Sequence, residues 1–162
     1  MSSCHNHSSD LRKYRFSNSG QVYLVTASTK GRHPLFNRFD LGQLVANEIR
    51  RSDELSFTKT TAFVVMPDHF HWLFQLQSGH SLASAVMRVK GRSAYRINRI
   101  GNRIGPVWQA GYHDRNVRNE ESLEALGNYV IANPVRGRLV AEVNEYPLWD
   151  LMWRRWSSRI RG

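Results

Sequence analysis

Four segments of the chain have the apolar pattern that is typical of β-strands. Three of them are rich in β-branched and aromatic residues: 21–29 (QVYLVTAST), 59–65 (KTTAFVV) and 69–76 (HFHWLFQL). Pro67 lies between the second and the third and cannot donate to a strand ladder, so it separates them. The run 107–113 (VWQAGYH) predicts a further short strand.

Three other segments repeat apolar residues at the spacing of an α-helix, and we expect helices over 37–51, 81–100 and 120–132. Asp40 and Ser81 are the expected N-caps of the first two. Pro134 should end the third helix near Asn133.

The order of these elements predicts the fold class. Strand, helix, two strands, helix, short strand and helix suit an α+β, ferredoxin-like two-layer sandwich with an antiparallel sheet and helices on one face. A chain of 162 residues is most simply one domain. We expect that domain over 12–150, with a flexible N-terminus (1–11) and a basic tail rich in Trp and Arg (151–162).

Composition narrows the classes of function. The net charge is +10, with 41% hydrophobic residues, so the chain is no disordered polycation and its partner is expected to be a polyanion such as nucleic acid. A basic protein that is merely soluble is the alternative. No membrane span or secretory signal is seen, and Cys4 is the only cysteine, so we expect a cytoplasmic protein.

The surplus charge lies in two places. The first lies within 69–113, which has no acidic residue. Its six candidate DNA-binding residues are Arg88, Lys90, Arg92, Arg96, Arg99 and Arg103. Four of them, Arg88, Arg92, Arg96 and Arg99, fall within an arc of about 80° on the expected helix, and we call these four the arginine stripe. A solvated charged face is the alternative, but such faces normally mix signs.

The second place is the tail, where Arg154 and Arg155 are candidate DNA-binding residues beside Trp153 and Trp156. A disordered basic end is the alternative there.

His69 and His71 are the sharpest chemical feature. Residues i and i+2 of a strand share a face, so both imidazoles project together and can ligate one divalent metal. Pairs at this spacing also occur by chance, as core or surface histidines. On the last helix Tyr129 and Asn133, at i and i+4, share a face. Tyr129 can act as a nucleophile and Asn133 can offer an oxygen ligand, or Tyr129 can simply pack against its neighbours.

Taken together, MPDHFHWLF (66–74), WQAGYHDRNVR (108–118) and YVIANPVRGRLV (129–140) resemble the REP-associated tyrosine transposases. These are relatives of the single-tyrosine HUH transposases of insertion sequences, the IS200-like family. The resemblance runs in matching order from about Arg12 to Trp149.

The resemblance implies a function and roles for particular residues. His69, His71 and Asn133 would hold Mg²⁺ or Mn²⁺, Tyr129 would be the nucleophile, and His113 and Asp114 would support the site. The substrate would be a short palindromic hairpin with flanking single-stranded DNA, cleaved through a 5′-phosphotyrosine with possible rejoining. The resemblance also favours a monomer over a dimer, and DNA binding would associate the protein with the bacterial nucleoid.

Two alternatives remain at this point. One is a non-catalytic ferredoxin-like module that binds structured DNA or RNA through the same basic face. The other is a metal-dependent phosphodiesterase that uses water in place of tyrosine.

Overall fold

The computed structural model describes residues 20–118 and 121–152, so Arg154, Arg155, most of the predicted tail and the N-terminus lie outside the described part. Its main strands and helices follow the chain in the expected order. They are β1 (Val22–Ser28), α2 (Phe39–Glu54), β2 (Thr58–Met66), β3 (His69–Leu76), α3 (Leu82–Ile100), β4 (His113–Val117), α4 (Leu123–Ile131), α5 (Asn133–Arg136) and β5 (Trp149–Leu151). Three short 3₁₀ turns complete it: η1 (Lys30–Arg32), η2 (Leu35–Asn37) and η3 (Val143–Glu145). No described helix is long and apolar enough to cross a bilayer.

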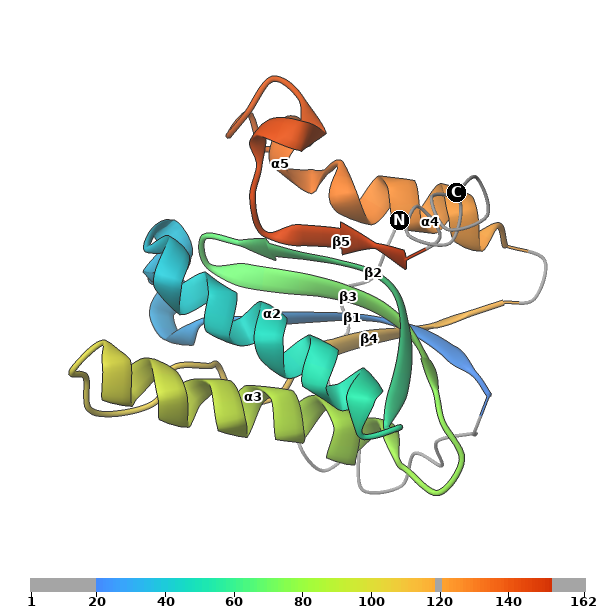
Figure 1. Cartoon of the computed structure of the whole chain (residues 1–162), viewed down its shortest axis with the longest axis horizontal. Helices are drawn as coiled ribbons and strands as arrows, with labels where there is room; N and C mark the ends of the chain where they lie inside the picture. Colours follow the sequence, from blue (N-terminus) through green and yellow to red (C-terminus); the bar gives the residue numbers. More distant parts are fainter. Residues whose placement is uncertain (1–19, 119–120, 153–162) are drawn as a thin grey trace.

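The five strands form one antiparallel sheet in the order β4-β1-β3-β2-β5. Helices α2 and α3 cover one face (Figure 1), where Trp72 and the other aromatic side chains of β3 are buried against them. The predicted α+β class with an antiparallel sheet is therefore confirmed.

The opposite face of the sheet is also covered. Helix α4 lies across it (Figure 1) and packs Val130 and Ile131 against Val64 and Leu73. The prediction placed the helices on one face, and the structure places the third predicted helix, α4, on the other. The physical reason is that β2 is apolar on both sides, since all of its last five residues are buried.

Some sequence predictions were wrong in detail. Arg38 rather than Asp40 occupies the N-cap of α2, and Asp40 instead pairs with it at 2.7 Å. Residues 107–112 form no strand: Trp108 makes one isolated bridge to Thr29, and Gly111 adopts a positive φ of 84°. The strand begins only at His113, where this loop ends.

The ends of α3 and α4 show why those helices form where they do. Ser81 caps α3 as predicted, in a reciprocal capping box with Ser84. Helix α4 begins at Leu123, later than expected, because Ser122 caps it through the backbone N–H of Ala125. Pro134 does end α4, and it also starts the short helix α5.

Candidate metal and tyrosine site

The histidines lie on the α4 face of the sheet. Along β3 the residues alternate, so Phe70 and Trp72 enter the core beneath α2 and α3 while His69 and His71 turn the other way. In the sheet register His71 stands opposite Thr26 of β1 and Val64 of β2. The predicted common face of the pair is what the structure shows.

Hydrogen bonds fix the orientation of both imidazole rings. His69 Nδ1 lies 2.7 Å from Asp68 Oδ1, and His71 Nδ1 lies 2.8 Å from Thr26 Oγ1. The two Nε2 atoms face each other at 3.2 Å. When Nδ1 carries the proton, each Nε2 presents a lone pair, and a histidine ligand is typically held by such a partner on its other nitrogen.

The same geometry bears on whether a metal fits. Without a metal, one Nε2 can carry the proton and donate to the other, whereas two Nε2 lone pairs that face each other repel unless a cation lies between them. Because Nε2 ligands sit ~2.1 Å from a transition-metal ion, two nitrogens 3.2 Å apart can reach one ion. The donors of His69 and His71 therefore fit a divalent cation.

His71 is held in its neutral form. Burial, followed by the charges of His69, Arg136 and Arg32, lowers its pKa to about 3. A ligand histidine must be deprotonated, so this environment keeps His71 ready to bind a cation across the neutral range.

Tyr129 projects from α4 and is 57% exposed, so it is open to a large substrate rather than packed in the core. The guanidinium of Arg136 stacks over its ring, with Cζ 3.7 Å from the ring centroid. Arg136 lies at the end of α5, seven residues after Tyr129 of α4, and this spacing of about two helical turns is the sequence signal that identifies it.

Asn133 does not complete a set of metal ligands here. Its Nδ2 donates to the carbonyls of Val130 (2.8 Å) and Tyr129 (3.4 Å), so the amide turns back on its own helix. Within the described ranges no group of three or more His, Cys, Asp and Glu side chains is placed to hold a metal. The structure therefore brings two of the three expected ligands together.

Three further residues at the site were not predicted. Asp68 is hydrogen-bonded to His69 through Oδ1 and forms an ion pair with Arg32 through Oδ2, where Arg32 Nε lies 3.0 Å away. Asp68 immediately precedes the histidine motif, so the sequence offered a signal for it. Thr26 and Arg32 come from distant segments, and no local pattern marks them.

His113 and Asp114 fall on opposite faces of β4. His113 pairs with Thr26, and Thr26 pairs with His71, so His113 shares the histidine face two strands away and is exposed. Asp114 pairs with Val25, whose side chain lies in the core on the other face. Of the two, only His113 is placed on the side of the sheet where support of the site is feasible.

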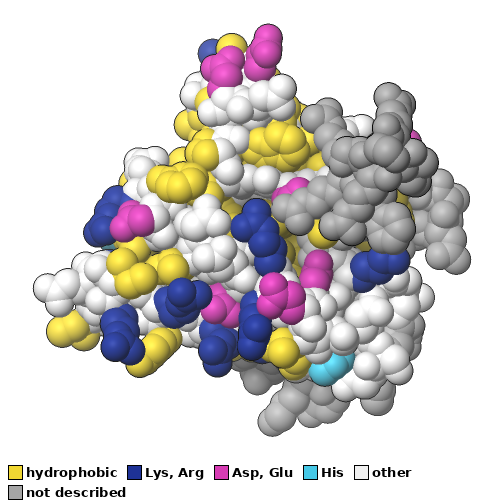
Figure 2. Space-filling model, viewed as in Figure 1, with side chains coloured by type: hydrophobic (Ala, Val, Ile, Leu, Met, Phe, Trp, Pro, Cys, Tyr) yellow, Lys and Arg dark blue, Asp and Glu magenta, His cyan; other side chains and the backbone are white. Residues whose placement is uncertain are grey.

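The arginine stripe lies on the far side of the sheet from the histidines, on the outer surface of α3. Figure 2 shows basic side chains gathered along this edge of the molecule, with acidic ones among them. Arg88, Arg92 and Arg96 all approach the buried carboxylate of Glu48 on α2, at 3.5, 3.6 and 3.5 Å. The segment 69–113 has no acidic residue, but Glu48, on a helix distant in sequence, supplies a balancing charge for three of the four arginines.

Lys90 is not part of an exposed basic face. It is buried, and its Nζ donates to the carbonyls of Gln109 (2.9 Å) and Gly111 (2.5 Å), which anchors the loop before β4. Arg103 donates to Asn98 (3.0 Å) and Arg99 to Tyr95 (3.4 Å), both on α3 itself. The expectation that Lys90 contacts DNA is corrected on this ground.

Comparisons with known proteins bear on the whole arrangement. The family model described as "Transposase IS200 like" matches residues 17–133, which include both histidines, Tyr129 and Asn133. A REP-associated tyrosine transposase of Escherichia coli K12 is 20% identical over 139 residues, covering 86% of this chain and 80% of the relative.

The chain is also similar to a second sequence relative and to a solved structure. A Haemophilus influenzae protein, provisionally described in the same terms, is 25% identical over 99 residues, 55% of this chain and 56% of that relative, so the match spans little more than half of it. The structure of a REP-associated tyrosine transposase bound to a REP hairpin superposes with a TM-score of 0.69 at 20% identity, over 83% of this chain and 79% of the other. This likeness agrees with the α+β fold described above.

Proposed function

Because this chain belongs to the IS200-like transposase family, we propose that it is an enzyme that nicks single-stranded DNA beside a hairpin through a covalent tyrosine link. The observation that carries the proposal is the histidine pair, whose Nε2 atoms converge at 3.2 Å while Asp68 and Thr26 hold both Nδ1 atoms.

In the proposed reaction the oxygen of Tyr129 attacks the scissile phosphorus in line. The bond between Tyr129 and phosphorus forms as the bond from phosphorus to the 3′-oxygen breaks, which gives a 5′-phosphotyrosine and a free 3′-hydroxyl. The exposed tyrosine gives up its proton to solvent, and the 3′-oxygen takes one. Attack of a 3′-hydroxyl on the phosphotyrosine reverses the step and rejoins DNA.

His69 and His71 would hold the divalent metal, Mg²⁺ or Mn²⁺, and Asn133 would join them after a change of rotamer. The metal, when bound, supplies Lewis-acid polarisation of the phosphate. Asp68 fixes the ring orientation and the tautomer of His69, because a carboxylate only accepts, and Thr26 fixes the ring orientation of His71.

The proposed substrate is a REP-like hairpin, since the solved REP-associated tyrosine transposase that this fold resembles is bound to a REP hairpin. Arg92, Arg96 and Arg99 would hold DNA on the outer face of α3, away from the cleaved phosphate, and that contact should weaken with salt. We further propose that the chain acts as a monomer, which light scattering would test.

The decisive experiment incubates the protein with a labelled hairpin oligonucleotide that carries single-stranded flanks, in Mg²⁺ or Mn²⁺. We expect an adduct that survives denaturation, is absent in Tyr129→Phe, and persists in the control Tyr95→Phe, which changes an exposed tyrosine on α3. His69→Ala should abolish cleavage and leave hairpin binding largely intact.

Other outcomes would identify the alternatives. An adduct of unchanged yield in Tyr129→Phe would show that the nucleophile is wrongly assigned. Cleavage with turnover and no adduct would indicate a phosphodiesterase that uses water. Hairpin binding with no cleavage of either strand polarity would indicate a non-catalytic binding module.

A further inference from the structure

Two arginines approach the histidine pair from opposite ends of the chain. Arg32 comes from η1, directly after β1, and Arg136 from α5, directly after the tyrosine helix. Arg32 pairs with Asp68, whose other oxygen holds His69. Arg136 is followed by Gly137, which lies beside Met66, the register partner of His69. Both arginines are exposed, although positive charge beside a cation site is unfavourable unless an anion also binds there.

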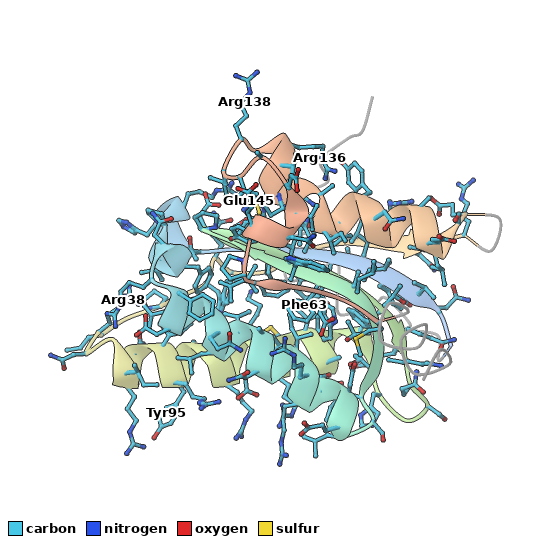
Figure 3. All side chains as sticks on the ribbon, turned by 45° about the horizontal axis from the view of Figure 1, so that its top comes forward. Arg38, Phe63, Tyr95, Arg136, Arg138 and Glu145 are labelled. Atoms are coloured by element: carbon cyan, nitrogen blue, oxygen red, sulfur yellow. The ribbon has the colours of Figure 1, made fainter. Side chains whose placement is uncertain are left out.

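Arg136 is held by the ring of Tyr129. A guanidinium that stacks its flat face on an aromatic ring keeps the N–H groups of its edge free for other partners. These donors lie beside the residue that would attack phosphorus. Arg138, two residues on, points away from the body of the domain (Figure 3) and makes no such contact with Tyr129.

Arg32 is held by Asp68 and Ser28. Its Nε lies 3.0 Å from Asp68 Oδ2, and its Nη1 donates to Ser28 Oγ at 2.8 Å. A guanidinium has five N–H donors, so these contacts leave donors for an anion, and the side chain remains 55% exposed. Its backbone φ of 56° is uncommon outside glycine and marks a position that the surrounding structure imposes.

We propose that Arg32 and Arg136 form a phosphate clamp in which each donates to a non-bridging oxygen of the phosphate that Tyr129 attacks. Arginine suits this role because its planar fork matches phosphate geometry. Asp68 is the acid at this place, and its two oxygens already serve His69 and Arg32, so the clamp retains net positive charge.

The clamp rests on the proposed function, since it assigns the partner of that same site. It adds that the phosphate is gripped by this chain's own arginines before any metal is present. Binding in the presence of EDTA therefore tests the clamp separately from cleavage.

The first experiment titrates inorganic phosphate into the metal-free protein and follows the Nε–Hε resonances of the arginine side chains. We expect those of Arg32 and Arg136 to shift and saturate, while that of Arg138 stays in place. Equal shifts at all three, or no shift at Arg32 and Arg136, would overturn the clamp. A positive result with no DNA adduct would leave the clamp standing and remove the nucleophile assignment.

The second experiment measures binding of the cleavage-site oligonucleotide to the Tyr129→Phe protein in EDTA. One oligonucleotide carries a normal phosphate at the scissile linkage, and its twin carries a neutral methylphosphonate there. Arg32→Gln and Arg136→Gln should each weaken binding of the charged oligonucleotide by roughly tenfold and leave binding of the neutral one unchanged. Arg138→Gln is the matched control, and equal losses with both oligonucleotides would contradict the proposal.

Discussion

Glu48→Gln should change folding stability and DNA affinity in opposite directions. Glu48 is the shared partner of Arg88, Arg92 and Arg96, and its side chain is only 5% exposed. Removing one partner of a buried ion pair destabilises by ~3–5 kcal/mol. Here Arg92 and Arg96 are 62% and 43% exposed, so water screens their share and we expect a loss of about 1–3 kcal/mol.

The same substitution leaves three arginines without their shared carboxylate. If the arginine stripe binds DNA, the affinity for a single-stranded oligonucleotide should rise roughly threefold at ~0.05 M salt, because a repelling charge is removed within a Debye length of the backbone. The dependence of affinity on salt should become steeper.

Thermal unfolding and fluorescence anisotropy measure the two effects on one preparation. A loss of 2 kcal/mol corresponds to a fall in Tm of roughly 4–8 °C for a domain of this size. Glu54→Gln is the matched control: it makes the same change in net charge on α2, but at a side chain that is 63% exposed and pairs with Arg51. We expect little change in its Tm and a smaller gain in DNA affinity.

Two results would refute the reasoning. An unchanged Tm in Glu48→Gln would mean that the three contacts contribute nothing to folding. A reduced Tm with the same DNA affinity as Glu54→Gln would mean that DNA does not lie on the arginine stripe.

Three further predictions concern other parts of the molecule. Thr26→Val removes the hydroxyl beside His71 Nδ1 and should lower Mn²⁺ affinity ~10–100-fold by calorimetry, with little change in Tm; an unchanged affinity would show that this bond does not tune the site. In EDTA, the free energy of unfolding should fall as the pH drops from ~6.5 towards 3. The reason is that His71 binds a proton in the unfolded chain but stays neutral in the folded one, where its pKa is about 3. His71 alone accounts for at most ~1.4 kcal/mol per pH unit. Urea titrations should show a flatter profile for His71→Gln, and an identical slope would contradict the buried neutral form. Lys90→Met leaves the carbonyls of Gln109 and Gly111 without their buried donor, so we expect urea titrations to show a loss of ~2–4 kcal/mol in the free energy of unfolding. The salt dependence of DNA binding should stay as in the wild type. A reduced salt dependence would show that Lys90 does contact DNA.

Local pattern predicted the elements that carry the chemistry. The strand over 69–76 and the Ser81 cap agree with β3 and α3, since alternation and capping are properties of neighbouring residues. The common face of His69 and His71 followed from the strand period alone. These parts of the site needed no knowledge of the tertiary structure.

What the sequence did not disclose depends on partners far along the chain. Glu48 lies 40 residues from Arg88, and the loop that Lys90 anchors has the same apolar composition as a strand. Thr26 reaches His71 only because β1 and β3 are neighbours in the sheet. Register and helix packing decide such contacts, and a local pattern in one sequence does not encode them.

The short strand β5 has a consequence for solubility. It pairs with Ala62, Phe63 and Val64, and Leu148 extends the pairing by accepting from the backbone of Val65, so this segment covers the outer edge of the most apolar strand. An uncovered edge of that kind is a template for strand addition between molecules. A chain interrupted before Leu148 keeps the histidines and the tyrosine helix but loses this cover and two buried leucines, Leu148 and Leu151. We therefore expect it to self-associate, which light scattering would measure.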